Sequence, residues 1–506
     1  RNFKTQYWPF GNMGLSMQNP YWVVNRDGFD NHKDRFVLSG GLTWKFAKGF
    51  SFAGRAKVDK TNALYEKKYS ASTETLFAST YGAYYRANED TRQVYGDAIL
   101  NMDKYFGDFS VNANLGASIK DENYVYNNVG GYLGSMASLA SSDLAHGFAL
   151  GNVTKSTSTI EQNDYHHQVQ SVFATAQVGF RSMVYLDATA RNDWDSYLGD
   201  TKYKNKGFFY PSVGMSFILT DMIPEIKGKV LSFLKLRGSY SEVGNSPVRF
   251  APSLTYPYKN GSIATSTRYP NPNLEPERTK SWEMGLESHL WGNKLNLNVS
   301  LYDTKTTNQY FEPQLSATSG YTTIGINGGL IENKGIEASL TLNQPLGPVQ
   351  WTSIFNYTLN RNKIKKLLRP TTIESGETIS LDALDVLNLG SVKVRLTEGG
   401  SIGDLYVTTL KTDEHGYVIV DYTSKQVAGV DDGNYVYAGN TSPKYSMSWR
   451  NNFAWNGLHL GVLVTGRFGG RVVSLTQGWM DSYGVSKSTA DARDEGGALV
   501  NGVRIP

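Results

Sequence analysis

Apolar and polar residues alternate along most of this chain, and the clearest example is the stretch from Lys294 to Leu301. Leu295, Leu297 and Val299 share one side of it with Leu301, and polar residues occupy the positions between them. A period of two predicts a β-strand with one apolar and one polar face. Because the pattern recurs in paired segments without a helical region, we predict an all-β fold, a transmembrane antiparallel β-barrel with lipid outside and a polar lumen inside.

About fourteen segments carry this pattern, and most of them form pairs joined by tight turns such as Ala47-Lys48-Gly49 and Asn456-Gly457. Gly and Asn suit such turns because they tolerate the backbone conformations that tight hairpins require. The predicted strands cover 36–46, 50–58, 94–104, 109–119, 172–178, 184–190, 209–217, 234–240, 282–290, 294–301, 336–342, 351–359, 445–453 and 458–464.

Tight turns alternate with much longer connections. Short turns on one side and long loops on the other are typical of outer-membrane barrels, in which the turns are periplasmic and the loops extracellular. We therefore interpret residues 1–506 as one portion of a barrel domain, without a plug domain. Its extracellular loops are expected at about 61–91, 121–164, 243–278, 309–326, 363–444 and 468–506.

A soluble β-sandwich or propeller would also produce alternation, because one face of its sheets is buried. Two features favour the barrel. The strands reach the roughly nine to eleven residues that a tilted strand needs to cross a bilayer, and their polar faces carry Asn, Ser, Thr, Gln and both charges. The barrel model predicts that Lys235 and Glu337 face water and that Leu295 and Leu460 face lipid.

Composition narrows the function classes. With 50 Lys+Arg against 46 Asp+Glu, the formal net charge is +4 and there are no basic runs, which gives no case for a nucleic-acid partner. Cysteine is absent, so disulfides, thiolate metal sites and Cys nucleophiles are excluded. Aromatic residues make up 13% of the chain, as suits membrane interfaces. No apolar run approaches the roughly 20 residues of a membrane-spanning helix.

Four segments resemble the SusC/RagA-type branch of TonB-dependent outer-membrane transporters. They are Tyr269 to Thr279 (YPNPNLEPERT) with the strand start Trp282 to Leu286, Asn327 to Glu337 (NGGLIENKGIE), Gly439 to Tyr445 (GNTSPKY), and Arg191 to Ser196 (RNDWDS). The matches span about 190–470. We read the first two as barrel architecture: prolines hold an extended entry into a strand, and Gly335 is expected to mark a kink or bulge.

The resemblance implies a 22-stranded barrel with a plugged lumen, of which this chain would supply about two thirds of the strands. It also implies a signal sequence, a TonB-contacting segment, a plug and last strands that are not in this sequence, so we expect an internal portion of a longer precursor. Further implied are a SusD-like surface lipoprotein and the TonB complex as partners, the latter through the missing N-terminal part.

No catalytic, cofactor-binding or metal-binding residues are assigned. Gly399 to Gly403 spells G-x-S-x-G, but a nucleophile elbow needs a following helix, and 404–408 reads as a strand. His166 and His167 are adjacent, so a strand points them to opposite faces. Aromatic residues of the loops are candidate substrate contacts because sugar rings and peptide side chains pack on them. These candidates are Tyr256, Tyr258, Tyr269, Tyr310, Trp479 and Tyr483.

The resulting hypothesis is a barrel in the outer membrane of a Gram-negative bacterium, crossing it many times. It would import oligosaccharides or oligopeptides actively, without cofactors or covalent chemistry. Two alternatives stay open: an outer-membrane barrel enzyme, for which we find no convincing Ser, His and acid set, and a secreted soluble carbohydrate-binding β-protein.

Overall fold

A single antiparallel sheet of 14 strands dominates the computed structural model, and its strands follow one another in sequence order. The described residues are 18–135, 147–249, 251–256, 258–259, 262–264, 266–315, 319–368, 371–372, 378–379, 383–421, 423, 427, 435–500 and 503–505. The wall strands are β1 (Gly28–Ala47), β2 (Phe50–Tyr69), β3 (Ala83–Phe106), β4 (Phe109–Tyr132), β5 (Thr159–Phe180), β6 (Val184–Asp195), β7 (Phe208–Ile218), β8 (Leu231–Asn245), β12 (Glu277–Leu290), β13 (Leu295–Phe311), β15 (Ile326–Leu346), β16 (Val349–Lys366), β23 (Tyr445–Trp455) and β24 (Leu458–Phe468). All fourteen predicted strands are confirmed.

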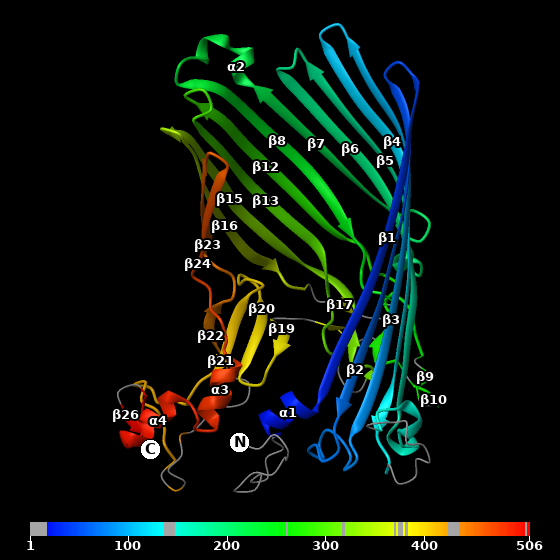
Figure 1. Ribbon diagram of the computed structural model, residues 1–506, viewed down its shortest axis with the longest axis vertical. Helices are drawn as coiled ribbons and strands as arrows, with labels where there is room; N and C mark the ends of the chain where they lie inside the picture. Colours follow the sequence, from blue (N-terminus) through cyan, green and yellow to red (C-terminus); the bar gives the residue numbers. More distant parts are fainter. Residues whose placement is uncertain are drawn as a thin grey trace.

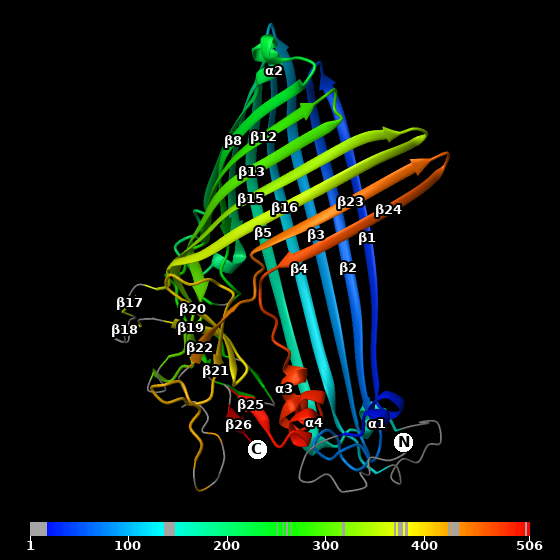
Figure 2. The same cartoon turned by 90° about the vertical axis from the view of Figure 1, so that its left-hand side faces the viewer.

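The wall is strongly curved, and its edge strands β1 and β24 lie on opposite sides of the view (Figure 1). Seen from the side, β15, β16, β23 and β24 run at a clear angle to β1–β5 (Figure 2). Such progressive rotation between neighbours is the twist that strand sterics impose, and it bends a long sheet toward a barrel. Within the described residues the sheet ends at β1 and β24 and does not close on itself.

The predicted asymmetry of the connections is confirmed. Tight turns gather at one end of the wall and long connections at the other, which we call the turn end and the loop end (Figure 1). Gly49 and Gly292 adopt positive φ angles of 76° and 63° in two of the turns, where a residue with a side chain is disfavoured. One connection at the turn end is longer: it carries α2 (Leu219–Met222) and the 3-10 helix η5 (Pro224–Ile226) between β7 and β8.

Several strands are much longer than the apolar pattern predicts. β3 and β4 each have 24 residues and continue deep into the ranges expected as loops, so that 61–69, 83–91 and 121–132 are strand. On β4 the apolar positions of one face run only from Phe109 to Ile119, and Asp121 and Asn123 follow on the same side. Roughly half of the strand therefore projects beyond the apolar band, and in this half polar residues, tyrosines and two valines replace the regular alternation.

The two faces of the wall differ as predicted. Apolar residues are paired across the strands on one face, as in the row formed by Leu100, Leu115 and Ala174. Many of these side chains are exposed, including Leu42 at 75% and Leu115 at 56%. The register places Leu295 and Leu460 on this apolar face, and Lys235 and Glu337 on the opposite, polar face.

Aromatic pairs border the apolar band at both ends. Near the turn end Phe109 and Phe180 lie 5.0 Å apart between ring centroids, and near the loop end Tyr240 and Trp282 lie 4.6 Å apart. Rings with a polar edge favour the boundary between an apolar and an aqueous layer. On β4 the apolar band runs from Phe109 to Ile119, which matches the roughly nine to eleven residues that a tilted strand needs to cross a bilayer core.

Gly335 has a different role from the predicted kink. The only register shift between β15 and β16 lies at Leu330/Ile331, so the strand is regular at Gly335. A Cβ atom at Gly335 would lie 2.3 Å from the Tyr302 hydroxyl oxygen and 2.4 Å from the Leu359 carbonyl oxygen. The glycine is therefore needed because the Tyr302 ring of the neighbouring strand lies directly over it.

The loop end has a core of its own. Phe311, Ile324, Ile331, Ile364 and Leu396 are buried together there. Leu396 comes from a separate four-stranded sheet made of β19 (Ala383–Asn388), β20 (Val392–Thr397), β21 (Asp404–Thr408) and β22 (Tyr435–Asn440). Short pairs complete the loops: β9 (Tyr258–Lys259) with β10 (Ser262–Ile263), β11 (Arg268–Tyr269) with β14 (Thr323–Ile324), β17 (Thr371–Thr372) with β18 (Thr378–Ile379), and β25 (Ala498–Val500) with β26 (Val503–Ile505).

Helices occur at the loop end as well. They are α1 (Pro20–Arg26), η2 (Leu150–Asn152), η3 (Lys155–Thr157), η4 (Ser196–Leu198), α3 (Leu475–Ser482) and α4 (Lys487–Asp494). Trp22 of α1 is buried and donates a hydrogen bond to the Thr73 hydroxyl at 3.0 Å. Asp27, which follows the helix, accepts hydrogen bonds from the Ser70 amide and the Thr73 hydroxyl, and its burial raises its pKa.

Across the described part of the chain, no helix is long and apolar enough to cross a membrane, a finding that concerns helices alone and has no bearing on a β-barrel.

Candidate functional site

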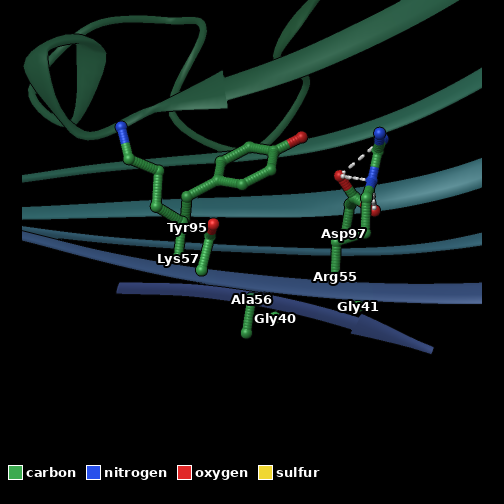
Figure 3. Close-up of a pocket in the computed structure, with 8 residues that line it drawn as sticks. Gly40, Gly41, Arg55, Ala56, Lys57, Tyr95 and Asp97 are labelled. Carbon is green, nitrogen blue, oxygen red and sulfur yellow. Dashed lines mark hydrogen bonds and ion pairs between the residues drawn. The ribbon is translucent and has the colours of Figure 1, made fainter. Parts of the chain in front are cut away.

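Ion pairs link neighbouring strands on the polar face. Arg35 of β1 donates hydrogen bonds of 2.8 and 2.6 Å to the two oxygens of Asp59 in β2. Nearer the turn end, Arg55 lies 2.9 Å from the Asp97 carboxylate, while Ala56 points to the other side of the wall (Figure 3). Both aspartates are buried, and both arginine side chains remain more than half exposed. This face is therefore charged yet internally paired, as a water-filled lumen requires.

The polar face is the enclosed side of the wall. Arg249, from the connection after β8, donates a hydrogen bond of 2.9 Å to Asn163 and lies 4.5 Å from the centroid of the Tyr165 ring. Ser246 donates a 2.7 Å hydrogen bond to Asp195 at the end of β6. Asn163 and Tyr165 lie on the polar face of β5, because the residues between them face the apolar side. The connection after β8 therefore folds over the polar face.

A concave surface rich in tyrosine lies on the polar face at the loop end of β2–β4. We call it the tyrosine recess. Its volume is about 700 Å³. It is lined by Tyr65, Lys67, Tyr69, Leu76, Phe77, Tyr85, Ala87, Glu89, Tyr126, Asn128 and Tyr132. The five tyrosines are half-buried, so part of each ring remains accessible.

Strand alternation explains why these tyrosines meet. Tyr65 and Tyr69 are four residues apart on β2 and therefore share one face of the strand. Tyr85 of β3 lies opposite Lys67 of β2. Tyr126 of β4 lies opposite Glu89. Leu76 and Phe77 reach the recess from the connection between β2 and β3. A strand-borne cluster of this kind holds its rings in fixed positions, which lowers the entropic cost of ordering them around a ligand.

The side chains that line the recess suit the binding of a ligand. Tyrosine rings pack on sugar rings or on peptide side chains, and Lys67, Glu89 and Asn128 add groups that form hydrogen bonds. Among the described residues no group of three or more His, Cys, Asp or Glu side chains is placed to hold a metal ion. His166 pairs with Asp121 and His167 with Asp195, on opposite faces as predicted.

The G-x-S-x-G stretch is a turn, as predicted. It connects β20 to β21, and Gly399 has a φ of 83°. The Ser401 amide donates a 2.7 Å hydrogen bond to Asp404, and its hydroxyl donates one of 3.1 Å to Asn362. No helix follows within the described residues of this hairpin, so the geometry of a nucleophile elbow is not met.

The aromatic candidates from the sequence do not converge on one site. Tyr256 is exposed on a loop, and Tyr258 lies in β9 but its side chain is outside the described residues. Tyr269 packs against the core of the loop end, 5.1 Å from the Tyr321 ring. Tyr310 is half-buried and donates a 2.5 Å hydrogen bond to Glu312. These last two side chains contribute to packing.

Trp479 of α3 and Tyr483, the residue that follows this helix, form a separate pair. Their rings stack with centroids 5.9 Å apart, and both side chains are exposed. An exposed aromatic pair of this kind is a ready contact surface. It belongs to a different element from the tyrosine recess.

The sequence contained a signal for the tyrosine recess that was missed. The ranges 61–91 and 121–164 were expected as loops, and in a loop alternation carries no meaning. If the strands are extended through them, the tyrosines at 65 and 69 share one face of their strand, and those at 126 and 132 share one face of theirs. The register places both pairs on the polar face of the wall.

Comparison with known proteins agrees with this fold. The family model described as "TonB dependent receptor-like, beta-barrel" matches residues 2–493. The chain belongs to this family. The resemblance seen in the motifs is thereby confirmed at the level of the TonB-dependent receptor barrel, as is the all-β fold class.

Relatives from Formosa agariphila share this family. "TonB-dependent receptor P3" is 23% identical over 508 residues, covering 95% of this chain and 49% of that protein. "TonB-dependent receptor P26" is 24% identical over 353 residues, covering 63% of this chain and 34% of that protein. The chain thus spans about half the length, or less, of these relatives.

Solved structures share the fold of the TonB-dependent barrel. The RagAB peptide transporter superposes with a TM-score of 0.70 at 19% identity, covering 89% of this chain and 49% of the other. The RagAB peptide importer in its "closed-closed" state gives 0.69 at 18% identity, covering 90% and 49%. At these identities the likeness establishes the arrangement of the wall strands.

Proposed function

We propose that this chain forms part of the wall of an importer in the outer membrane of a Gram-negative bacterium. The importer would be powered through a TonB complex. Membership of the TonB-dependent receptor barrel family supports this assignment. The face pattern supports it independently, because an exposed apolar band bordered by aromatic pairs is stable only against an apolar solvent such as lipid.

We propose an oligosaccharide or oligopeptide as the substrate and a SusD-like surface lipoprotein as a partner at the loop end. The tyrosine recess supports this substrate class, because it is large enough for several sugar or amino-acid units and combines rings with polar groups. The structural neighbours named as RagAB are described as a peptide transporter and a peptide importer, which supports peptides as one of the two candidate substrate classes. Tyr256, Trp479 and Tyr483 remain candidate contacts on the loops.

The single observation that carries the proposal is the position of the tyrosine recess on the enclosed polar face at the loop end. A substrate arriving from the loop side would meet these rings before it reached the ion pairs deeper in the wall. Binding there requires no movement of the strands, since the rings are held by the ladder.

The test uses the full-length protein in vesicles and measures binding of a mixed oligopeptide pool and of a mixed neutral oligosaccharide pool. Tyr85→Ala combined with Tyr126→Ala is expected to weaken binding of one pool about tenfold, because aromatic contacts contribute about 0.5–1.5 kcal/mol each. Tyr105→Ala is the matched control: this ring is 78% exposed at the turn end, away from the recess. Binding of neither pool, or equal effects of both variants, would contradict the assignment.

A further inference from the structure

The outward face of β12–β16 changes from apolar to charged within one residue row. The row Met284, Leu301, Ile336 and Leu359 is entirely apolar. One step toward the loop end, Trp282 is followed across the strands by Asp303, Lys334 and Arg361. The next row on the same face is Lys280, Lys305, Glu332 and Lys363.

Positive charge prevails in this region, which we call the basic belt. Its basic members are Arg278, Lys280, Lys305, Lys334, Arg361, Lys363 and Lys365, and the acidic residues among them are Glu242, Asp303 and Glu332. The basic side chains are exposed or half-exposed; Lys334 is 55% accessible and Lys280 49%. The surplus is local, because the whole chain carries a formal charge of only +4.

Glu332 organises one end of the basic belt. Its carboxylate is buried and lies 3.0 Å from the Lys365 ammonium, 3.2 Å from Lys334 and 3.7 Å from Lys305. Asp303 lies 3.4 Å from Lys334 and 3.9 Å from Lys305, so two carboxylates serve three ammonium groups and one positive charge is left over. Holding like charges together in advance removes part of the ordering cost of binding an anion between them.

Two further cations add to this field. Arg361 and Lys363 are exposed on β16, and within the described residues neither forms an ion pair. They stand beside Lys334 and Glu332 in the register, at the spacing of about 4.8 Å between neighbouring strands. Their charges are therefore available to a ligand outside the wall.

The first charged row on the outward face of β1–β5 is different. There Phe36, Lys60, Arg92, Asn123 and His166 form the corresponding row. Acidic partners accompany its cations: the Lys60 ammonium lies 3.3 Å from Asp90 and the His166 ring 2.6 Å from Asp121. The charge surplus is a property of β12–β16 and not of the whole border.

We propose that the basic belt binds the phosphate-bearing headgroup of a lipid in the leaflet next to the loop end. The apolar rows would take the acyl chains and fix their depth, and Trp282 with Tyr240 marks the level where headgroups begin. Lysine and arginine at that level meet the phosphates, which carry the complementary charge. This inference rests on the membrane location proposed above.

The test places the full-length protein in phosphatidylcholine nanodiscs that contain a minor fraction of diphosphorylated lipid A, and measures the lipid A retained per protein by native mass spectrometry. Arg361→Gln with Lys363→Gln is expected to lower its affinity about twenty-five-fold, since each cation near an anionic membrane surface contributes about fivefold. The matched control is Lys60→Gln with Arg92→Gln, one lysine and one arginine in the first charged row of β1–β5, which is expected to retain lipid A.

The outcomes separate the possibilities. Equal retention by both variants and the parent protein would overturn the proposal, as would equal binding of dephosphorylated lipid A. Displacement of lipid A by millimolar inorganic phosphate would also overturn it, because the belt would then be a site for a free anion. Failure of the protein to enter nanodiscs at all would instead refute the membrane location. Measuring substrate binding by the Arg361→Gln, Lys363→Gln variant tests the proposed import function independently of the lipid site.

Discussion

Replacing Leu115 by arginine tests whether the apolar face of the wall meets lipid. Leu115 lies midway along the apolar band of β4, between Phe109 and Asp121, with Leu100 and Ala174 beside it in the register. It is 56% exposed, so the substitution removes little internal packing. The effect of Leu115→Arg therefore reports on what covers this face rather than on the neighbouring strands.

The expected magnitudes differ enough to decide the question. An arginine facing the middle of a bilayer destabilises an outer-membrane barrel by about 2–4 kcal/mol, because the guanidinium loses its hydration. On a face that meets water, the same exposed substitution would change stability by no more than about 0.5 kcal/mol. We therefore expect the free energy of unfolding of Leu115→Arg to fall by about 2–4 kcal/mol.

The assay is reversible denaturant unfolding of the full-length protein in lipid vesicles. Asn112→Arg is the control, because Asn112 is exposed on the polar face of the same strand, opposite Asp103 in β3. An arginine there meets water and an acidic neighbour, so a change below about 0.5 kcal/mol is expected. Losses of equal size at both positions, or no loss at Leu115, would refute the assignment of the faces.

Three further predictions concern local packing and titration. Gly335→Ala is expected to cost about 1–3 kcal/mol through the close contact described above, measured by the same unfolding assay, whereas Gly40→Ala, with no atom within 4 Å of the added Cβ, should be neutral. Leu274→Ala is expected to cost about 2–5 kcal/mol, because the side chain is fully buried; a cost like that of an exposed leucine would contradict this. Burial raises the pKa of Asp27 above its ordinary 3.8, so the folded state binds the proton more tightly, and the packing of α1 should weaken as pH rises through that pKa. Hydrogen exchange of 20–27, corrected for intrinsic rates, should show this trend in the parent protein and lose it in Asp27→Asn.

The strands within the apolar band were predictable from the sequence. Between Phe109 and Ile119 the outward positions are apolar and the inward ones polar, and this contrast has a period of two that local reading detects. From Asp121 onward the outward face mixes Asp and Asn with Val125 and Val129, so the contrast between the faces is lost. β4 continues to Tyr132 because β3 and β5 supply hydrogen-bond partners on both sides. The predicted loop boundaries were too wide for this reason.

The candidate residues show the same limit. Tyr269 and Tyr310 are aromatic and lie near loops, but Tyr269 packs against Tyr321 from a segment distant in the sequence, and Tyr310 donates a hydrogen bond to the nearby Glu312. Conversely, the tyrosine recess required the register of β2, β3 and β4, which local sequence does not encode. The exposed pair formed by Trp479 and Tyr483 depends on α3, a helix that the alternation pattern does not predict.

By itself, the sequence determined the fold class, the number of wall strands, their order and the side of each that is apolar. The reason is that the apolar and polar faces of a strand follow from the alternation of consecutive residues. The tertiary structure decided which tyrosines gather into one recess, why Gly335 must be a glycine, and where lysines from separate strands surround Glu332. Those features arise from register between strands far apart in the chain, and register is fixed by the pairing of whole strands rather than by any one segment.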